Sequence, residues 1–171
     1  MTNINDLFFD GHYKDIWRAI IPAQLTDREI RFMLEYFDLK PGDEVLDMMC
    51  GYGRHSLALA EKGIRVTAVD NLLEYITEIR DKALASNLPV FPLLANIIDY
   101  HPTGRYKLAI CMGNSLNFFD AGNTAKLLQY WAEALAPGSH LLINSWSLAE
   151  IVIPQFVERS EAEQGDLKII S

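Results

Sequence analysis

The stretch VLDMMCGYGRHSLALAEKGIRVTAVD, residues 45–70, decides the fold. Its apolar run EVLDMM (44–49) has the length of a buried strand and ends in a turn containing Gly51 and Gly53. HSLALAEKG then has the pattern of a helix closed by glycine, and the β-branched run IRVTAVD (64–70) follows it. A strand, a helix and a strand in this order predict a parallel β-α-β unit.

The same alternation continues to residue 146. We therefore expect an α/β fold, a Rossmann-like three-layer αβα sandwich around a mainly parallel sheet of about five strands. In such sheets ligands bind at the carboxyl ends of the strands, where the strand order reverses. The further elements expected are a helix over 71–86, strands over 89–95, 106–112 and 140–146, and a helix over 123–136.

Length and composition predict one globular domain. The chain has 171 residues, of which 50% are hydrophobic and 22% charged, enough for a real core. No apolar run approaches the roughly 20 residues of a membrane helix, and the N-terminus lacks a secretory signal pattern. Two cysteines form no disulfide framework, so we expect a reduced, cytoplasmic protein. The net charge of −8 disfavours a nucleic-acid partner, because phosphates are bound by clustered Lys and Arg.

The turn after the first strand carries an acid and two glycines. Gly51 and Gly53 flank Tyr52, which permits close backbone approach to a ligand. Met49 fills the first glycine position of the dinucleotide pattern G-x-G-x-x-G, and Asp47 stands where a phosphate is disfavoured. The carboxylate of Asp47 suits a ligand with an ammonium group. The alternative is a glycine turn that only joins strand to helix.

Polar residues also follow the other strands. Asp70 ends the second strand, where a carboxylate can accept hydrogen bonds from both hydroxyls of a ribose. It also suits the positive end of a helix, which is the structural alternative. Asn96 after the third strand can form hydrogen bonds with the amino edge of adenine, and Asp99 is the alternative residue for this contact. The side chain of Ile97 can pack on the base. Ordinary loop chemistry is the alternative for this segment.

The loop after the fourth strand reads CMGNSLNFF, residues 111–119. Gly113 permits close approach, and the side chains of Asn114 and Ser115 could orient a nucleophile. The alternative is that Asn114 is a helix cap and that Phe118 and its neighbour only pack a helix.

Residues 45–70 resemble the first two motifs of class I S-adenosylmethionine (SAM)-dependent methyltransferases, most closely a bacterial group with the motif L-D-x-x-C-G-x-G-R-H-S. The resemblance covers about residues 8–146. It implies SAM as cofactor, S-adenosylhomocysteine (SAH) as product, and a Tyr13 that belongs to an N-terminal lid. The cofactor-binding residues expected on this basis are Tyr13, Asp47, Met48, Met49, Cys50, Gly51, Gly53, His55, Asp70, Asn71, Leu72, Asn96, Ile97, Met112 and Gly113.

The sequence departs from the family pattern at several positions. Met49 stands where many members carry glycine, and Asn96 replaces a commonly acidic adenine contact. Leu72 stands where a Ser cap is frequent, and Asn71, at capping-box spacing from Glu74, is expected to cap the helix instead. The same spacing predicts another helix start at Thr26.

Three regions are expected: an N-terminal helical lid (1–40), the SAM-binding core (41–150) and a C-terminal segment (151–171). The usual C-terminal antiparallel hairpin of the sheet is expected to be missing. The fifth strand then has an open edge, so we expect residues 151–171 to cover it or to contact a second copy, giving a homo-oligomer.

These observations predict methyl transfer from SAM to a small-molecule acceptor, without nucleic acid, membrane or metal. No catalytic base is assigned; Tyr13 and Asn114 are the catalytic candidates. The alternatives are a non-catalytic SAM-binding or assembly module and an NAD-type oxidoreductase, which lacks its third glycine here.

Overall fold

The computed structural model describes residues 11–144, 161–164 and 167–170. From residue 44 strands and helices alternate, except that residues 95–105 link the third and fourth strands without a helix. The elements are α2 (Tyr13–Ile20), α3 (Ala23–Tyr36), β1 (Glu44–Met48), α4 (Arg54–Ala60), β2 (Arg65–Asp70), α5 (Leu73–Ala85), β3 (Val90–Leu94), β4 (Tyr106–Cys111), η1 (Ser115–Phe118), α6 (Ala121–Ala134), β5 (Leu135–Ile143), β6 (Glu161–Gln164) and β7 (Leu167–Ile170).

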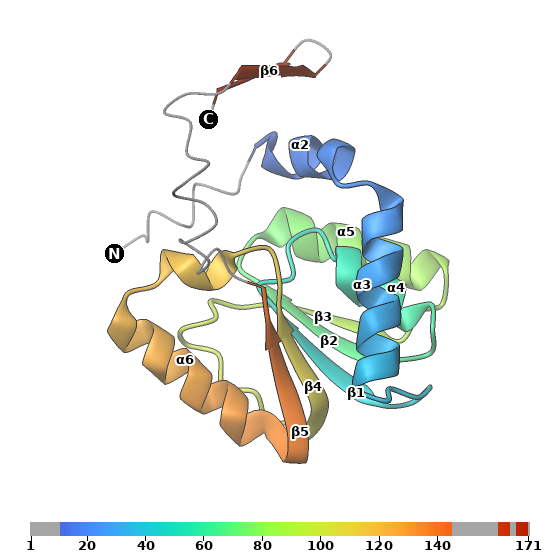
Figure 1. Ribbon diagram of the computed structural model, residues 1–171, viewed down its shortest axis with the longest axis vertical. Coiled ribbons are helices and arrows are strands. Elements are labelled where there is room, and N and C mark those ends of the chain that lie inside the picture. The colour runs from blue at the N-terminus through green and yellow to red at the C-terminus, as the bar shows by residue number, and fades with distance from the viewer. Residues whose placement is uncertain (1–10, 145–160, 165–166, 171) are drawn as a thin grey trace.

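Five strands form one parallel sheet in the order β3-β2-β1-β4-β5 (Figure 1). The chain moves outward from β1 to β3 on one side and then returns to β4 on the other. The order therefore reverses at β1, which is where a parallel sheet leaves a crevice for a ligand. The loops after β1, β2 and β4 all begin at this edge of the sheet.

Helices cover both faces of the sheet: α3, α4 and α5 lie on one side and α6 on the other (Figure 1). Successive side chains of a strand point to opposite faces. Val45 accordingly packs with Met33 of α3, whereas Leu46 packs with Trp131 of α6. All four of these side chains are fully buried. The three-layer αβα architecture expected from the sequence is confirmed.

The third strand is more exposed than its apolar sequence suggests. In β3 only Val90 is buried, while Phe91 is 53% exposed. The cause is position, because β3 is the edge of the sheet and no helix follows it before β4. Among the described residues, no helix has the length and apolar character needed to span a bilayer.

The C-terminal strands β6 and β7 pair antiparallel with each other and form a separate two-stranded sheet. Within the described ranges no strand pairs with the outer edge of β5. The expectation that residues 151–171 cover that edge or contact a second copy falls largely on residues 151–160, which lie outside the described part of the chain.

The expected helix start at Thr26 is wrong. Helix α3 begins three residues earlier, at Ala23, after an extended Pro22. Thr26 therefore lies inside the first turns of the helix, and its Oγ1 accepts a hydrogen bond from Nη1 of Arg54 at 2.9 Å. The Thr26 side chain therefore forms a contact between two helices and does not cap the start of α3.

The expected cap at Asn71 is also wrong. Helix α5 begins at Leu73 with Leu72 as its N-cap, and no side chain caps it from that position. The N–H of Leu72 instead donates to Oδ1 of Asp70 at 3.0 Å. A carboxylate at the end of β2 thus satisfies a backbone group at the start of the helix.

Candidate functional site

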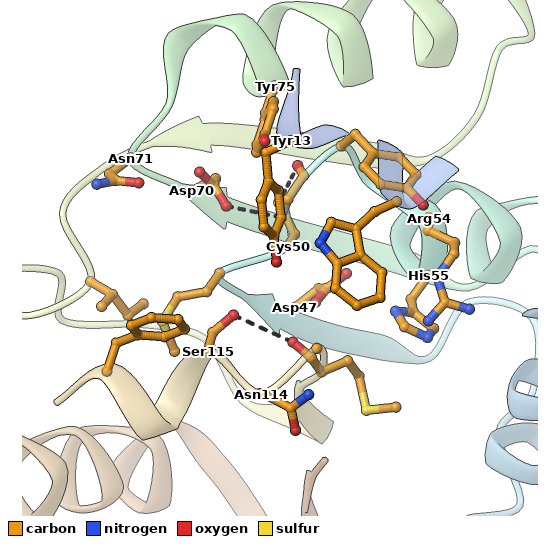
Figure 2. A pocket seen from close by; sticks show the side chains of 18 of the residues that line it. Tyr13, Asp47, Cys50, Arg54, His55, Asp70, Asn71, Tyr75, Asn114 and Ser115 are labelled. Atoms are coloured by element: carbon orange, nitrogen blue, oxygen red, sulfur yellow. Dashed lines mark hydrogen bonds between the residues drawn. The ribbon is translucent and has the colours of Figure 1, made fainter. Parts of the chain in front are cut away.

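A cavity lies at the carboxyl ends of β1, β2 and β4, under α2 (Figure 2). The cavity has a volume of about 200 Å³ and opens to solvent. The residues predicted from the sequence that line it are Tyr13, Asp47, Met49, Cys50, Gly51, His55, Asp70, Asn71, Asn96, Ile97, Met112, Gly113 and Asn114. Figure 2 shows Tyr13 near the centre of the view, with Asp70 and Asp47 on either side of it and Asn114 and Ser115 below.

The glycine turn brings main chain to the cavity wall. Gly51 has φ +56°, and a Cβ built on it would meet no atom within 4 Å. Met49 also has a positive φ, +55°, a conformation that costs energy for a residue with a side chain. The backbone is therefore exposed to a ligand at Gly51, as the glycine pattern predicted.

Asp70 closes this turn from the neighbouring strand. Its Oδ2 accepts a hydrogen bond from the N–H of Gly51 at 2.9 Å, and its Oδ1 accepts from Leu72. The side chain is 7% exposed, and burial raises its pKa in spite of these backbone donors. The N–H of Asn71 is a third backbone donor to this carboxylate. A carboxylate has about four acceptor sites, so the group can still accept a hydrogen bond from a ligand in the cavity.

Asp47 lies at the bottom of the cavity and is 1% exposed. Its Oδ2 accepts a hydrogen bond from Oγ of Ser56 at 2.5 Å, a neutral partner. Burial raises the pKa of Asp47 to about 6, against the opposing influence of His55 and the Ser56 hydrogen bond. A buried carboxylate is costly without a cation, so a positively charged ligand group would be stabilised here.

Glu29 links α3 to the start of α4. Its Oε2 lies 3.0 Å from Nε2 of His55 and also accepts a hydrogen bond from Nη1 of Arg54. Burial raises the pKa of Glu29, but the hydrogen bonds from His55 and Arg54 outweigh it and leave the pKa below its usual value. His55 and Arg54 both line the cavity, so Glu29 fixes two basic side chains of its wall.

The loops after β3 and β4 complete the wall. Oδ1 of Asn96 accepts a hydrogen bond from the N–H of Ile98 at 3.1 Å, which leaves its amide N–H₂ as a donor toward a ligand. Ile97 is buried, yet it also lines the cavity. On the other side Gly113 and Asn114 both have positive φ, and Asn114 precedes η1 as its N-cap.

Met48, Gly53 and Leu72 do not line the cavity. The side chain of Met48 points into the core with Leu46 and is fully buried. Gly53 is the N-cap of α4 and packs against α5, and Leu72 is the N-cap of α5. These three support the residues that face the cavity. The expectation that ligands bind at the carboxyl ends of the strands located the turns correctly, but it did not predict which side chain of each turn faces the cavity.

Several wall residues were not assigned to the cofactor by the sequence. Trp17 stands four residues after Tyr13, so both lie on one face of α2, and their ring centroids are 5.9 Å apart. That helical spacing was the available signal. Tyr52 and Phe118 also line the cavity. Tyr52 belongs to the quoted turn, but nothing in its sequence shows that its ring faces inward.

Cys50 and Cys111 are both free thiols. Burial raises the pKa of Cys50 well above its usual value and that of Cys111 to about 12. Both therefore remain protonated near neutral pH.

The chain was then compared with known proteins. Residues 45–138 match the family model described as "Methyltransferase domain". Over 81 residues, which are 47% of this chain, it is 32% identical to the 23S rRNA (uracil(1939)-C(5))-methyltransferase RlmD of Shewanella sp. (strain ANA-3). That alignment spans only 17% of the relative.

Solved structures show the same fold. A S-adenosylmethionine-dependent methyltransferase from Clostridium acetobutylicum ATCC 824 superposes with a TM-score of 0.69 and 22% identity, covering 90% of this chain and 62% of that one. A coclaurine N-methyltransferase bound to N-methylheliamine and SAH superposes with a TM-score of 0.60 and 26% identity. This second match covers 68% of this chain and 35% of that protein.

Proposed function

The chain belongs to the methyltransferase domain family, and from this we propose that it transfers a methyl group from SAM to a small-molecule acceptor. One observation carries the proposal: two carboxylates, at the ends of adjacent strands, share one cavity with a glycine turn open to a ligand. Asp70 suits the two hydroxyls of the ribose and Asp47 the ammonium of the amino-acid tail. A coclaurine N-methyltransferase of this fold was crystallised with SAH.

The polarity of the cavity fits this nucleoside. Gly51 leaves room for the tail beside the backbone, and Asn96 and Ile97 provide a polar edge and an apolar surface for the base. When bound, SAM supplies a methyl group on a sulfonium, which a nucleophile removes while the bonding electron pair stays on sulfur. The residues of the chain then have to align the acceptor and exclude water.

Tyr13 and Asn114 take positioning roles in this proposal. Burial raises the pKa of Tyr13, so its phenol stays protonated near neutral pH and donates a hydrogen bond instead of removing a proton. Asn114 presents an amide, which has no basic character. Neither Tyr13 nor Asn114 is therefore assigned as a general base.

Calorimetry with SAH and with NAD tests the proposal. We expect SAH to bind with a Kd in the micromolar range and NAD to give no heat, because Met49 fills the first glycine position of the dinucleotide pattern and the carboxylate of Asp47 disfavours a phosphate. Tight binding of NAD would contradict the assignment. Incubation with methyl-labelled SAM and separate small-molecule and total-RNA fractions then identifies the acceptor class. Label in RNA would support an activity like that of RlmD, and binding without transfer would support a non-catalytic SAM-binding module.

The affinity for SAH should depend on pH through Asp47. Its pKa of about 6 means that the carboxylate, which attracts the ammonium, is ionised above pH 6 and protonated below it. We expect a constant affinity above about pH 7 and a loss approaching tenfold per pH unit below about 6. Calorimetry from pH 5 to pH 8 measures this, with proton release on binding near pH 6.

Two controls isolate this carboxylate. Methylthioadenosine lacks the amino-acid tail, so its affinity should show no step near pH 6. Asp47→Asn should bind SAH weakly at every pH. The stability of the free protein has the opposite trend. The pKa of Asp47 is higher in the folded than in the unfolded state, so its contribution to the free energy of unfolding is complete below the unfolded-state pKa. That contribution is lost as the pH rises through 6. A pH step that persists in Asp47→Asn would assign the effect to another group.

We also propose that α2 acts as a lid held by charge. The helix has no buried residue, yet it carries Tyr13 and Trp17 of the cavity wall. Lys14 forms ion pairs with Glu74 and Glu78 of α5. Arg18 pairs with Glu78 at 2.6 Å, and its guanidinium lies 4.8 Å from the ring centroid of Tyr52 in the glycine turn. Exposed ion pairs of this kind are weakened by salt.

Raising the NaCl concentration from about 0.05 M to about 0.5 M should therefore speed SAH dissociation by about threefold to tenfold. Stopped-flow fluorescence measures the rate. In Glu78→Gln dissociation should be fast at low salt and nearly independent of salt. Lys40→Gln removes an ion pair with Asp38, outside the cavity wall, and should leave the response unchanged. If the rate of SAH dissociation in Glu78→Gln depended on salt as in the unmodified protein, ion pairs of Glu78 would not hold the lid.

A further inference from the structure

Glu29 of α3 lies outside the cavity wall, yet it contacts two residues of that wall. Its Oε2 faces Nε2 of His55 at 3.0 Å and accepts a hydrogen bond from Nη1 of Arg54. Thr26, three residues earlier on the same face of α3, accepts a second hydrogen bond from Nη1 at 2.9 Å. Two residues of a neighbouring helix therefore hold the start of α4 beside the cavity.

These contacts are shielded from water. The side chains of Glu29, Arg54 and His55 are 22%, 17% and 7% exposed. An ion pair in this setting contributes more than one in open solvent, and a partner left alone in it carries an uncompensated charge. Loss of the Glu29 carboxylate should therefore displace Arg54 and His55 from their present orientation.

The contact also fixes the proton on the ring of His55. Burial raises the pKa of Glu29, but hydrogen bonds from His55 and Arg54 leave it below its usual value, so the group is ionised near neutral pH. An ionised carboxylate only accepts hydrogen bonds. Nε2 of His55 therefore carries a hydrogen in the neutral ring and in the charged ring alike, which selects one tautomer.

The start of α4 lies next to Asp47. Oγ of Ser56 donates a hydrogen bond to Oδ2 of Asp47 at 2.5 Å. Burial raises the pKa of Asp47 while the charges of His55 and Arg54 oppose this, so both basic side chains lie within electrostatic reach of the carboxylate. In the view of Figure 2, Asp47 lies between Asp70 and His55. A ligand that extends from Asp70 past Asp47 therefore meets Arg54 and His55.

The amino-acid tail of SAM has the chemistry that this end of the cavity requires. Its ammonium, which the proposed function pairs with Asp47, shares one carbon atom with a carboxylate. That carboxylate must lie close to the ammonium and needs hydrogen-bond donors. Nη1 of Arg54 uses both of its N–H groups on Thr26 and Glu29. Within the described part of the chain, the N–H groups of Nε and Nη2 remain as donors.

We infer that Glu29 is a positioning residue for the amino-acid tail of SAM, because it fixes the orientation of Arg54 and His55 toward the tail carboxylate. The inference rests on the proposed function and adds to it a residue outside the cavity. Glu29 acts through its two partners, as a supporting residue around a binding site does. Its effect should therefore be confined to ligands that carry the tail.

Two ligands test the inference: SAH carries the amino-acid tail, and methylthioadenosine lacks it. Each is titrated by calorimetry into the unmodified protein and into Glu29→Ala. We expect Glu29→Ala to weaken SAH binding by about tenfold, the effect of a lost hydrogen bond to a charged group, and to keep methylthioadenosine binding within about twofold. Equal losses for both ligands would assign Glu29 to the fold alone, and an unchanged SAH affinity would also overturn the inference.

A conservative variant and a matched control separate orientation from charge. In Glu29→Gln the amide oxygen can still accept hydrogen bonds from both partners, so SAH affinity should stay within about threefold of that of the unmodified protein. Glu35→Ala removes an exposed carboxylate from the same helix, outside the cavity wall, and should change neither affinity. A Glu29→Gln variant that binds SAH as weakly as Glu29→Ala would overturn the inference.

The proton on His55 can be observed without any ligand. Nitrogen-15 NMR of the imidazole rings, with the signal identified from its loss in His55→Gln, should show Nε2 protonated in the unmodified protein and a mixture of tautomers in Glu29→Ala. A neutral ring protonated at Nδ1 in the unmodified protein would overturn the inference. Failure of the unmodified protein to bind SAH would remove the proposed function as well, whereas normal SAH binding with an unselective Glu29→Ala variant would remove this inference alone.

Discussion

Asp70→Ala lowers the affinity for SAH by at least about 100-fold, which corresponds to about 2.7 kcal/mol of binding free energy. The variant removes the acceptor proposed for two ribose hydroxyls, and hydrogen bonds to a charged group contribute about 1.5–3 kcal/mol each. It also removes the partner of the Gly51 and Leu72 N–H groups, so the glycine turn loses its anchor to β2. Calorimetry on the purified variant gives the change in Kd directly.

A smaller change and a charge control separate these effects. Asp70→Asn keeps one carbonyl oxygen and should lose less affinity, on the order of tenfold. Asp81→Asn removes an exposed carboxylate of α5 outside the cavity wall and should bind SAH as the unmodified protein does. An Asp70→Ala variant that binds SAH normally would contradict the nucleoside assignment itself.

Gly53→Ala lowers the free energy of unfolding by about 2–4 kcal/mol, which combines backbone strain with overpacking. Gly53 has φ +78°, and a Cβ at this position would lie 2.5 Å from Cγ1 of Ile79. Ile79 is fully buried in α5, so it has little room to move. At about 2–4 °C per kcal/mol for a chain of this size, the melting temperature should fall by roughly 4–16 °C.

The other glycine of the turn is the matched control. Gly51→Ala has the same left-handed strain, but its new methyl group would meet no protein atom within 4 Å and would enter the cavity. We expect it to cost only about 1–2 kcal/mol of stability but to reduce SAH affinity. Adding Ile79→Val to Gly53→Ala relieves part of the overlap. If both glycine variants lost the same stability, the contact with Ile79 would not be the cause.

The sequence also predicted two helix starts that the structure places differently. Capping-box spacing describes which local hydrogen bonds are available at a helix start, but not which hydrogen-bond partner is used in the folded protein. Thr26 bonds to Arg54 across two helices, and Asp70 takes the N–H of Leu72. At Thr26 a contact with a residue far along the chain replaced the local one, whereas the N–H of Leu72 has a different local acceptor, two residues before it. A single sequence cannot weigh these against each other.

In the site, too, local sequence patterns predicted some features and the folded structure decided others. The position of acids and glycines after strands identified Asp47, Gly51 and Asp70 of the cavity wall, because parallel strands end at one edge of the sheet. The family resemblance added further wall residues, among them Tyr13 and His55. Neither showed that Met48 points into the core or that Trp17 faces the cavity. The side of the chain on which a residue falls depends on helix docking and strand register, which are set by the packing of the whole core.

The sequence by itself determined the parallel α/β order and the placement of Asp47, Gly51 and Asp70 at strand ends, since hydrophobic period and turn chemistry are local properties. Only the tertiary structure decided the charge environment of the cavity. Burial raises the pKa of Asp47 to about 6, and Glu29 compensates Arg54 and His55 from another helix. Electrostatic interactions depend on distance and burial in space, and neither quantity is written in the spacing of residues along the chain.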